Sequence, residues 1–98
     1  MKVKDLLEMS AAAARVECSD MTMPNRHRDV VVARELFCHY AYEHLNMKHS
    51  AIAYKLNMDR ASIYHLIKRY DDDVDCRDSK LWMADIRMMT LILTSYRA

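Results

Sequence analysis

The chain has 98 residues, of which 52% are hydrophobic, and its formal net charge is +1, so we expect one folded domain rather than a disordered segment. It contains no glycine and a single proline, Pro24. Because hairpin turns and phosphate-binding loops such as GxxxxGK[ST] and GxGxxG depend on glycine, this composition favours helices over sheets and excludes P-loop chemistry.

The sequence also predicts a compartment. No apolar run reaches the roughly 18 residues that a membrane span needs, and Asp5 and Glu8 interrupt the apolar segment of any signal peptide near the start. The three cysteines are an odd number and no two have a CxxC spacing, which favours reduced thiols over a disulfide framework. We therefore expect a cytoplasmic protein without a membrane span.

Two helices are predicted in the first half of the chain. Residues 2–17 have apolar side chains at helical spacing, and a connection through Pro24 follows because the residue before a proline avoids the α region. Residues 25–45 form the longest predicted helix, for which Asn25 is a suitable N-cap. The apolar stripe of this helix consists of Val30, Ala33, Phe37, Tyr40, Ala41 and His44.

Three helices are predicted in the second half. Residues 49–56 and 60–70 form two short helices, and the acidic segment 71–78 is interpreted as a connector. The last helix, 79–96, is apolar on two sides, so we expect one side in the core, and we hypothesise that the other packs on a second copy of the chain. The two stripes are Leu81, Met88 and Ile92, and Trp82, Ile86, Met89, Leu93 and Tyr96.

A helix-turn-helix is predicted over residues 48–70. Two short helices that cross nearly at right angles need a small residue at the crossing, which Ala53 provides. In the turn, Asn57 replaces the usual glycine, since asparagine tolerates the left-handed conformation best after glycine, and Asp59 is a natural N-cap for the second helix. The inner faces consist of Ile52, Leu56, Ile63, Leu66 and Ile67.

The outward face of the second helix is rich in side chains that contact base edges and phosphates. It consists of Arg60, Ala61, Ser62, Tyr64, His65, Lys68 and Arg69. Residues 51–70 carry a local charge of +3, which the whole-chain sum hides because residues 71–79 carry −4. This pattern predicts binding to double-stranded DNA, with a helical hairpin that has a solvated basic face as the plainer interpretation.

Residues 57–69, with the sequence NMDRASIYHLIKR, resemble the signature of the C-terminal DNA-binding domain of the bacterial replication initiator DnaA, which runs G-R-D-H-[ST]-T-V-x-H-A-x-x-K. Asp59, Ser62 and His65 match in type and spacing, and the resemblance covers about residues 26–70. The turn glycines are missing, and Arg60 and Ala61 stand where the family has histidine and threonine. We therefore do not expect the family's own DNA site.

The resemblance implies an all-α, Trp-repressor-like fold of four to five helices. In the family the second helix enters the major groove, and a basic loop before the long helix reaches the minor groove. Base contacts are then expected from Asp59, Arg60, Ala61, Ser62 and His65. Contacts to the DNA backbone are expected from Arg26, Arg28, Arg34, Lys55, Tyr64, Lys68 and Arg69. The chain has no ATPase module, so we expect a phage or mobile-element protein of replication or transcription rather than an initiator.

Other classes of function are less well supported by the residues. No spacing indicates a catalytic, cofactor or small-molecule site, so we do not expect an enzyme. The acidic residues 71–75 lack the glycine and glutamate of a calcium loop, and His44 and His49 are wrongly spaced for zinc on one helical face. A protein–protein adaptor or inhibitor that uses the last helix or the acidic segment remains the alternative.

Overall fold

The protein is all-helical in the part of the chain that the structure describes. The computed structural model describes the backbone of residues 1–76 and 79–97, and side chains as far as residue 95. These residues contain no strand, which confirms the predicted all-α class. The elements are α1 (Val3–Ala14), the 3₁₀ helix η1 (Cys18–Thr22), α2 (Arg28–His44), α3 (His49–Leu56), α4 (Arg60–Val74) and α5 (Lys80–Arg97).

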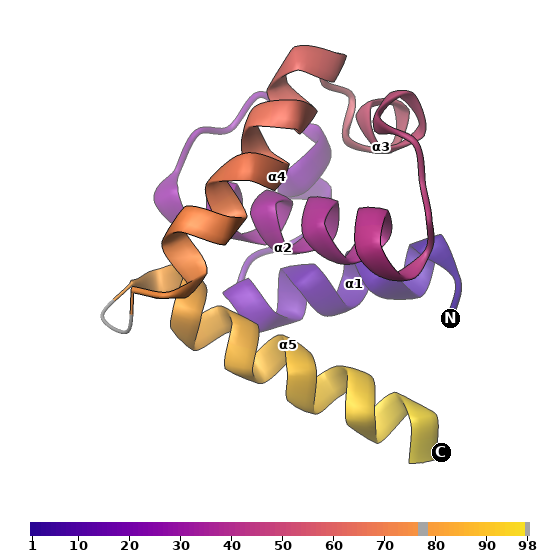
Figure 1. The fold of residues 1–98 in the computed structure, drawn as a ribbon, viewed down its shortest axis with the longest axis vertical. Coiled ribbons are helices and arrows are strands. Elements are labelled where there is room, and N and C mark those ends of the chain that lie inside the picture. Colours follow the sequence, from indigo (N-terminus) through magenta and orange to yellow (C-terminus); the bar gives the residue numbers. More distant parts are fainter. Residues whose placement is uncertain (77–78, 98) are drawn as a thin grey trace.

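Helix α2 lies at the centre of the fold (Figure 1) and packs against η1 and all four other α-helices. The predicted stripe of α2 is buried except for His44, and the seven consecutive residues 32–38 are all buried. A helix that is enclosed on every side buries its polar residues along with its apolar ones. Arg34 and Glu35 therefore lie inside the protein and need partners there.

The first two helices begin and end at different residues from those expected. Helix α1 stops before Arg15, which adopts the left-handed conformation at φ 60° and ends the helical hydrogen bonding. Helix α2 begins after His27, whose ring nitrogen Nδ1 accepts a hydrogen bond from the Asp29 N–H at 3.3 Å. Asn25 is not the N-cap, because its side chain accepts a hydrogen bond from the His27 N–H at 2.9 Å.

Helix α4 is longer than predicted. It continues to Val74, so the first four residues of the expected connector 71–78 are helical, while residues 77 and 78 lie outside the described residues. Buried Tyr70 anchors the helix beyond the predicted end, and the Asp73 carboxylate pairs with basic side chains. The Ser79 hydroxyl then donates a hydrogen bond to the Asp73 carbonyl at 3.1 Å, which joins the end of α4 to the start of α5.

Helices α3 and α4 pack together as a helix–turn–helix pair. Asn57 adopts the left-handed conformation, at φ 55° and ψ 47°, as the sequence predicted. The Met58 N–H donates to the carbonyl of buried Ala53 at 2.9 Å, and Asp59 Oδ1 caps α4 by accepting a hydrogen bond from the Ser62 N–H at 2.7 Å. The inner faces pack as expected, with Ile52, Leu56, Ile63 and Leu66 buried and Ile67 partly buried.

Helix α5 has one buried and one exposed apolar face. Leu81 and Met88 are buried and Ile92 is partly buried. The other predicted stripe is largely open, because Ile86, Met89 and neighbouring apolar side chains are about half exposed, and the Tyr96 side chain lies outside the described residues. None of the described helices is both long and apolar enough to cross a bilayer.

Candidate nucleic-acid interface

The outward face of α4 is open to solvent. Arg60, Ala61, Tyr64, His65 and Lys68 are exposed and Ser62 is partly exposed. Neither Arg60 nor Lys68 forms an ion pair with any described residue. These two cations are therefore free to meet an anionic partner, and they stand one at the start of the helix and one two turns further along.

The first turn of α4 is held in place by Asp59. Its hydrogen bonds from Ser62 lower the pKa of Asp59, so the carboxylate is charged at neutral pH. A charged cap satisfies one N–H at the positive end of the helix dipole and leaves those of Arg60 and Ala61 without a partner in the helix. Of the predicted base-contact residues, Asp59 thus already has a role in the fold.

A cleft of about 300 Å³ brings the basic loop and the helix–turn–helix together. Arg26 and the loop residues before it line one side of this cleft, and Asp59 and Ser62 line the other. Arg26 is exposed, so a basic side chain from outside the helix–turn–helix lies beside the start of α4. We use the term basic surface for those members of the predicted DNA-contact set that are at least partly exposed and whose side chains neither cap α4 nor form ion pairs: Arg26, Lys55, Arg60, Ala61, Ser62, Tyr64, His65 and Lys68.

Arg34 does not belong to the basic surface, which corrects the expectation that it contacts DNA. Its side chain is only 6% exposed because α2 is enclosed by the other helices. Its Nε donates a hydrogen bond to the Met21 carbonyl at 3.0 Å, and its two terminal nitrogens donate to the carbonyls of Asp20, Met23 and Asn25. Arg34 therefore fixes the loop that carries Arg26, and its effect on the basic surface is indirect.

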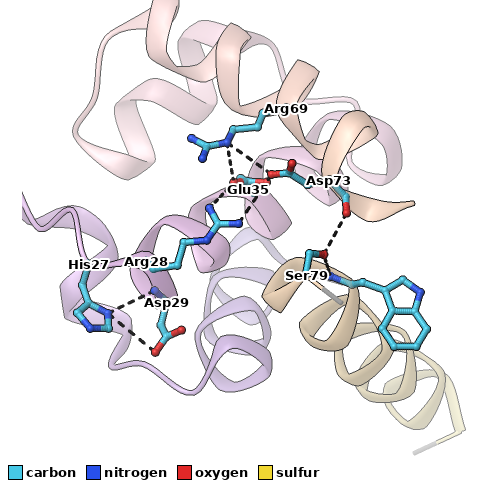
Figure 2. A network of polar contacts seen from close by, with 8 residues as sticks. His27, Arg28, Asp29, Glu35, Arg69, Asp73 and Ser79 are labelled. Atoms are coloured by element: carbon cyan, nitrogen blue, oxygen red, sulfur yellow. Dashed lines mark hydrogen bonds and ion pairs between the residues drawn. The ribbon is translucent and has the colours of Figure 1, made fainter. Parts of the chain in front are cut away.

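The guanidinium groups of Arg28 and Arg69 lie within ion-pair distance of the carboxylates of Glu35 and Asp73, although the two side chains remain 38% and 54% exposed (Figure 2). Arg69 Nε lies 3.6 Å from Glu35 Oε1 and 3.5 Å from Asp73 Oδ2. The Arg28 guanidinium lies 3.7 Å from Glu35 Oε1 and 3.9 Å from Asp73 Oδ2. Contrary to expectation, these two arginines are engaged in ion pairs that join α2 to α4, and we leave them out of the basic surface.

Glu35 is the residue of this cluster that the sequence did not reveal. Its side chain is fully buried, and neither of its oxygens accepts a hydrogen bond within the described residues. Burial, and next the nearby Asp73 carboxylate, raise the pKa of Glu35 to about 7, although Arg69 and Arg28 act in the opposite direction. The only signal in the sequence is a carboxylate in the segment 32–38, whose other members apart from Arg34 are apolar.

Exposed aromatic rings adjoin the basic surface. Tyr64 is 55% exposed, and its ring centroid lies 6.2 Å from that of His49, which in turn lies 5.2 Å from that of Tyr42. Tyr40 and Tyr70 are instead buried, so the tyrosines divide between core and surface. Tyr64 therefore offers a hydroxyl and a ring face at the edge of the basic residues.

The cysteines and the other side chains that commonly bind metals do not gather at one place in the described residues. All three cysteines are free thiols, and the described residues contain no cluster of three or more His, Cys, Asp or Glu side chains that could hold a metal ion.

The resemblance of residues 57–69 to the DnaA signature stays a prediction that rests on those residues. No protein-family model matches the chain, and neither the curated proteins nor the solved structures contain a match to it.

Proposed function

We propose that this protein binds double-stranded DNA through α3 and α4. The observation that supports the proposal best is the outward face of α4, on which Arg60 and Lys68 are exposed and unpaired while the opposite face packs on α2 and α3. The major groove is about 12 Å wide and admits one helix. A 15-residue helix with a capped, exposed start is well suited to enter it from its N-terminal end.

The basic surface divides into two kinds of contact. Arg60, Ser62 and His65 face the base edges in this proposal, and an arginine bonded to guanine is worth about 1–3 kcal/mol of discrimination. Lys55 and Lys68 neutralise phosphates, and Arg26 approaches the backbone or the neighbouring minor groove. The free N–H groups at the start of α4 add a further site for a phosphate oxygen.

The exposed face of α5 supports a second part of the proposal, a homodimer. Its large apolar side chains, Met83, Ile86, Met89 and Leu93, are 48–63% exposed. Such a continuous apolar stripe is typical of an interface. A two-fold dimer presents two α4 helices to two half-sites, so a palindromic target is expected. Location in the cytoplasm and a role in phage or mobile-element replication or transcription rest on the sequence alone.

The first test is fluorescence anisotropy with labelled random duplexes at about 50 and 200 mM salt. Three phosphate contacts, from Arg26, Lys55 and Lys68, predict a loss of affinity of roughly 40-fold over this range. The double variant Arg60→Ala with Lys68→Ala should weaken binding further, whereas Lys4→Ala, an exposed lysine on α1, serves as the matched control. Absence of binding at the lower salt concentration would overturn the proposal.

The α5 face also favours the alternative function, a protein–protein adaptor or inhibitor. An adaptor should bind its partner equally at both salt concentrations and after Arg60→Ala. It should lose that partner when Ile86 and Leu93 are replaced by glutamate, because a charge cannot be buried in an apolar interface without a large cost. A DNA-binding homodimer subjected to the same two substitutions should become a monomer in sedimentation experiments but keep salt-dependent DNA binding.

A further inference from the structure

A second pocket, of about 430 Å³, lies between α2, α4 and α5 and shares no residue with the basic surface. Aromatic rings from α2 and α4, among them those of Tyr40 and Tyr70, form one wall. Apolar side chains of α5, among them Met89 and Leu93, form the other wall. A mostly apolar pocket with a few convergent polar groups is the usual form of a small-molecule site.

The polar group in this pocket is the Asp85 carboxylate. Asp85 is only 8% exposed, and its Oδ1 accepts hydrogen bonds from the hydroxyls of Tyr40 and Tyr70, both at 2.7 Å. Burial, followed by Asp85 itself, raises the pKa of both tyrosines, so they remain neutral donors. No described residue forms an ion pair with Asp85. It is therefore a buried carboxylate without a basic partner, an arrangement that favours a cationic ligand.

The aromatic wall of the pocket also favours a cationic ligand. The His39 ring stacks on Tyr70 with 3.7 Å between centroids, and Tyr40 meets His39 edge-on at 4.9 Å. Burial lowers the pKa of His39, so its ring is neutral at pH 7 and does not compete as a cation. Glu43 and Asp71, on either side of His39, act on it together with Asp85. Ring faces attract cations, and these carboxylates make the surroundings negative.

We propose that the pocket binds a small organic ammonium ion, whose charged group lies at Asp85 and the tyrosine rings and whose apolar body lies against Met89 and Leu93. The free oxygen of Asp85, which accepts no hydrogen bond within the described residues, is the acceptor for the ammonium N–H. A metal ion does not fit, because one carboxylate among aromatic rings supplies too few ligands. The proposal does not depend on DNA binding. Met89 and Leu93 also belong to the α5 face of the proposed homodimer, so the ammonium ion and a second copy of the chain compete for these two side chains.

The test is an NMR titration of the ¹⁵N-labelled chain at pH 7 with benzylammonium, benzyl alcohol and benzoate. These probes share a ring and differ in charge. Benzylammonium should shift amide signals of residues 39–44 and 85–93 and bind at least about tenfold more tightly than benzyl alcohol, since charge-assisted contacts are roughly twice as strong as neutral ones. Equal binding of the two probes, or shifts confined to other residues, would overturn the proposal without any variant.

Asp85→Asn isolates the charge. The asparagine oxygen can still accept both tyrosine hydrogen bonds, and circular dichroism checks that the variant folds. This substitution leaves the exposed face of α5 unchanged, so it separates ligand binding from dimerisation. The variant should bind benzylammonium no more tightly than benzyl alcohol, whereas Asp72→Asn, at an exposed carboxylate of α4, should bind as the wild type does. A preference for the ammonium ion that survives Asp85→Asn contradicts the proposal.

Discussion

Arg69 Nε lies 3.6 Å from Glu35 Oε1, so a half-exposed arginine on the proposed DNA-binding helix pairs with a fully buried carboxylate. Glu35 belongs to the central helix α2, and Arg69 lies near the C-terminal end of α4. The pair therefore links the orientation of α4 to the core. Asp73 and Arg28 complete this link on either side (Figure 2).

Glu35 makes the stability of the protein depend on pH. Its pKa is raised to about 7 in the folded state, chiefly by burial and then by Asp73, so the folded protein binds more protons than the unfolded chain between about pH 4.5 and 7. The contribution of Glu35 to the free energy of unfolding therefore falls as pH rises through this range, by up to about 3 kcal/mol. Glu35→Gln should remove this part of the slope in urea unfolding experiments at pH 5 and pH 7.5. Identical slopes for variant and wild type would contradict the assignment.

Arg69 and its neighbour Lys68 should respond differently to replacement by alanine. Lys68 is exposed and unpaired, so Lys68→Ala should reduce the slope of log affinity against log salt by about 0.9 with little change in stability. Arg69→Ala should lower the free energy of unfolding, because it leaves Glu35 with less compensation for its buried charge. Its effect on the salt slope should be the smaller of the two. Anisotropy and urea unfolding of both variants check this, and the reverse order would return Arg69 to the basic surface.

Arg34 should be important for stability rather than for direct DNA contact. Arg34→Ala removes the side-chain donor from four carbonyls of residues 20–25, of which those of Asp20 and Met23 keep a backbone N–H donor. The loss should cost about 2 kcal/mol or more. Arg26→Ala is the matched control, since Arg26 is exposed on the loop that Arg34 holds. That variant should keep the wild-type urea midpoint but weaken DNA binding. If Arg34→Ala unfolded at the wild-type urea concentration, the role given to its hydrogen bonds would be wrong.

Asp59 should contribute to stability as the N-cap of α4. Asp59→Ala removes the acceptor for the Ser62 N–H and should lower the free energy of unfolding by about 1 kcal/mol. Asp59→Ser keeps a capping oxygen and should recover most of this loss. Thermal unfolding of the three proteins measures the effect. A serine variant as unstable as the alanine variant would show that the carboxylate acts through something other than the cap.

The helix–turn–helix could be predicted because its determinants are local. Asn57 and Asp59 lie within the turn itself, and the conformation of each follows from its own side chain. Ala53 and the apolar residues around it follow a helical period on a helix with one buried side. The extension of α4 to Val74 could not be predicted from local sequence. This part of the helix is stabilised by Tyr70, which lies in the core, and by the hydrogen bond from Ser79, which lies beyond the turn.

The pocket around Asp85 could not be predicted from the sequence, because it also depends on residues that are far apart in the chain. Tyr40 and Asp85 share a hydrogen bond although they are 45 residues apart. No sequence pattern near either residue predicts this contact. The sequence places Tyr40 in the apolar stripe of its helix and gives no role to Asp85. Only the packing of α5 across α2 and α4 brings them together.

The sequence by itself determined the all-α class, the turn between α3 and α4, and the outward face of α4. These depend on composition, backbone preference and helical period, which act over a few residues. Only the tertiary structure decided which cations face solvent, with Arg26, Arg60 and Lys68 exposed and Arg34 buried. The physical reason is that the middle of α2, residues 32–38, is buried on every side, so its sequence shows no separate polar face. The position of each charge then depends on helices that are far away in the chain.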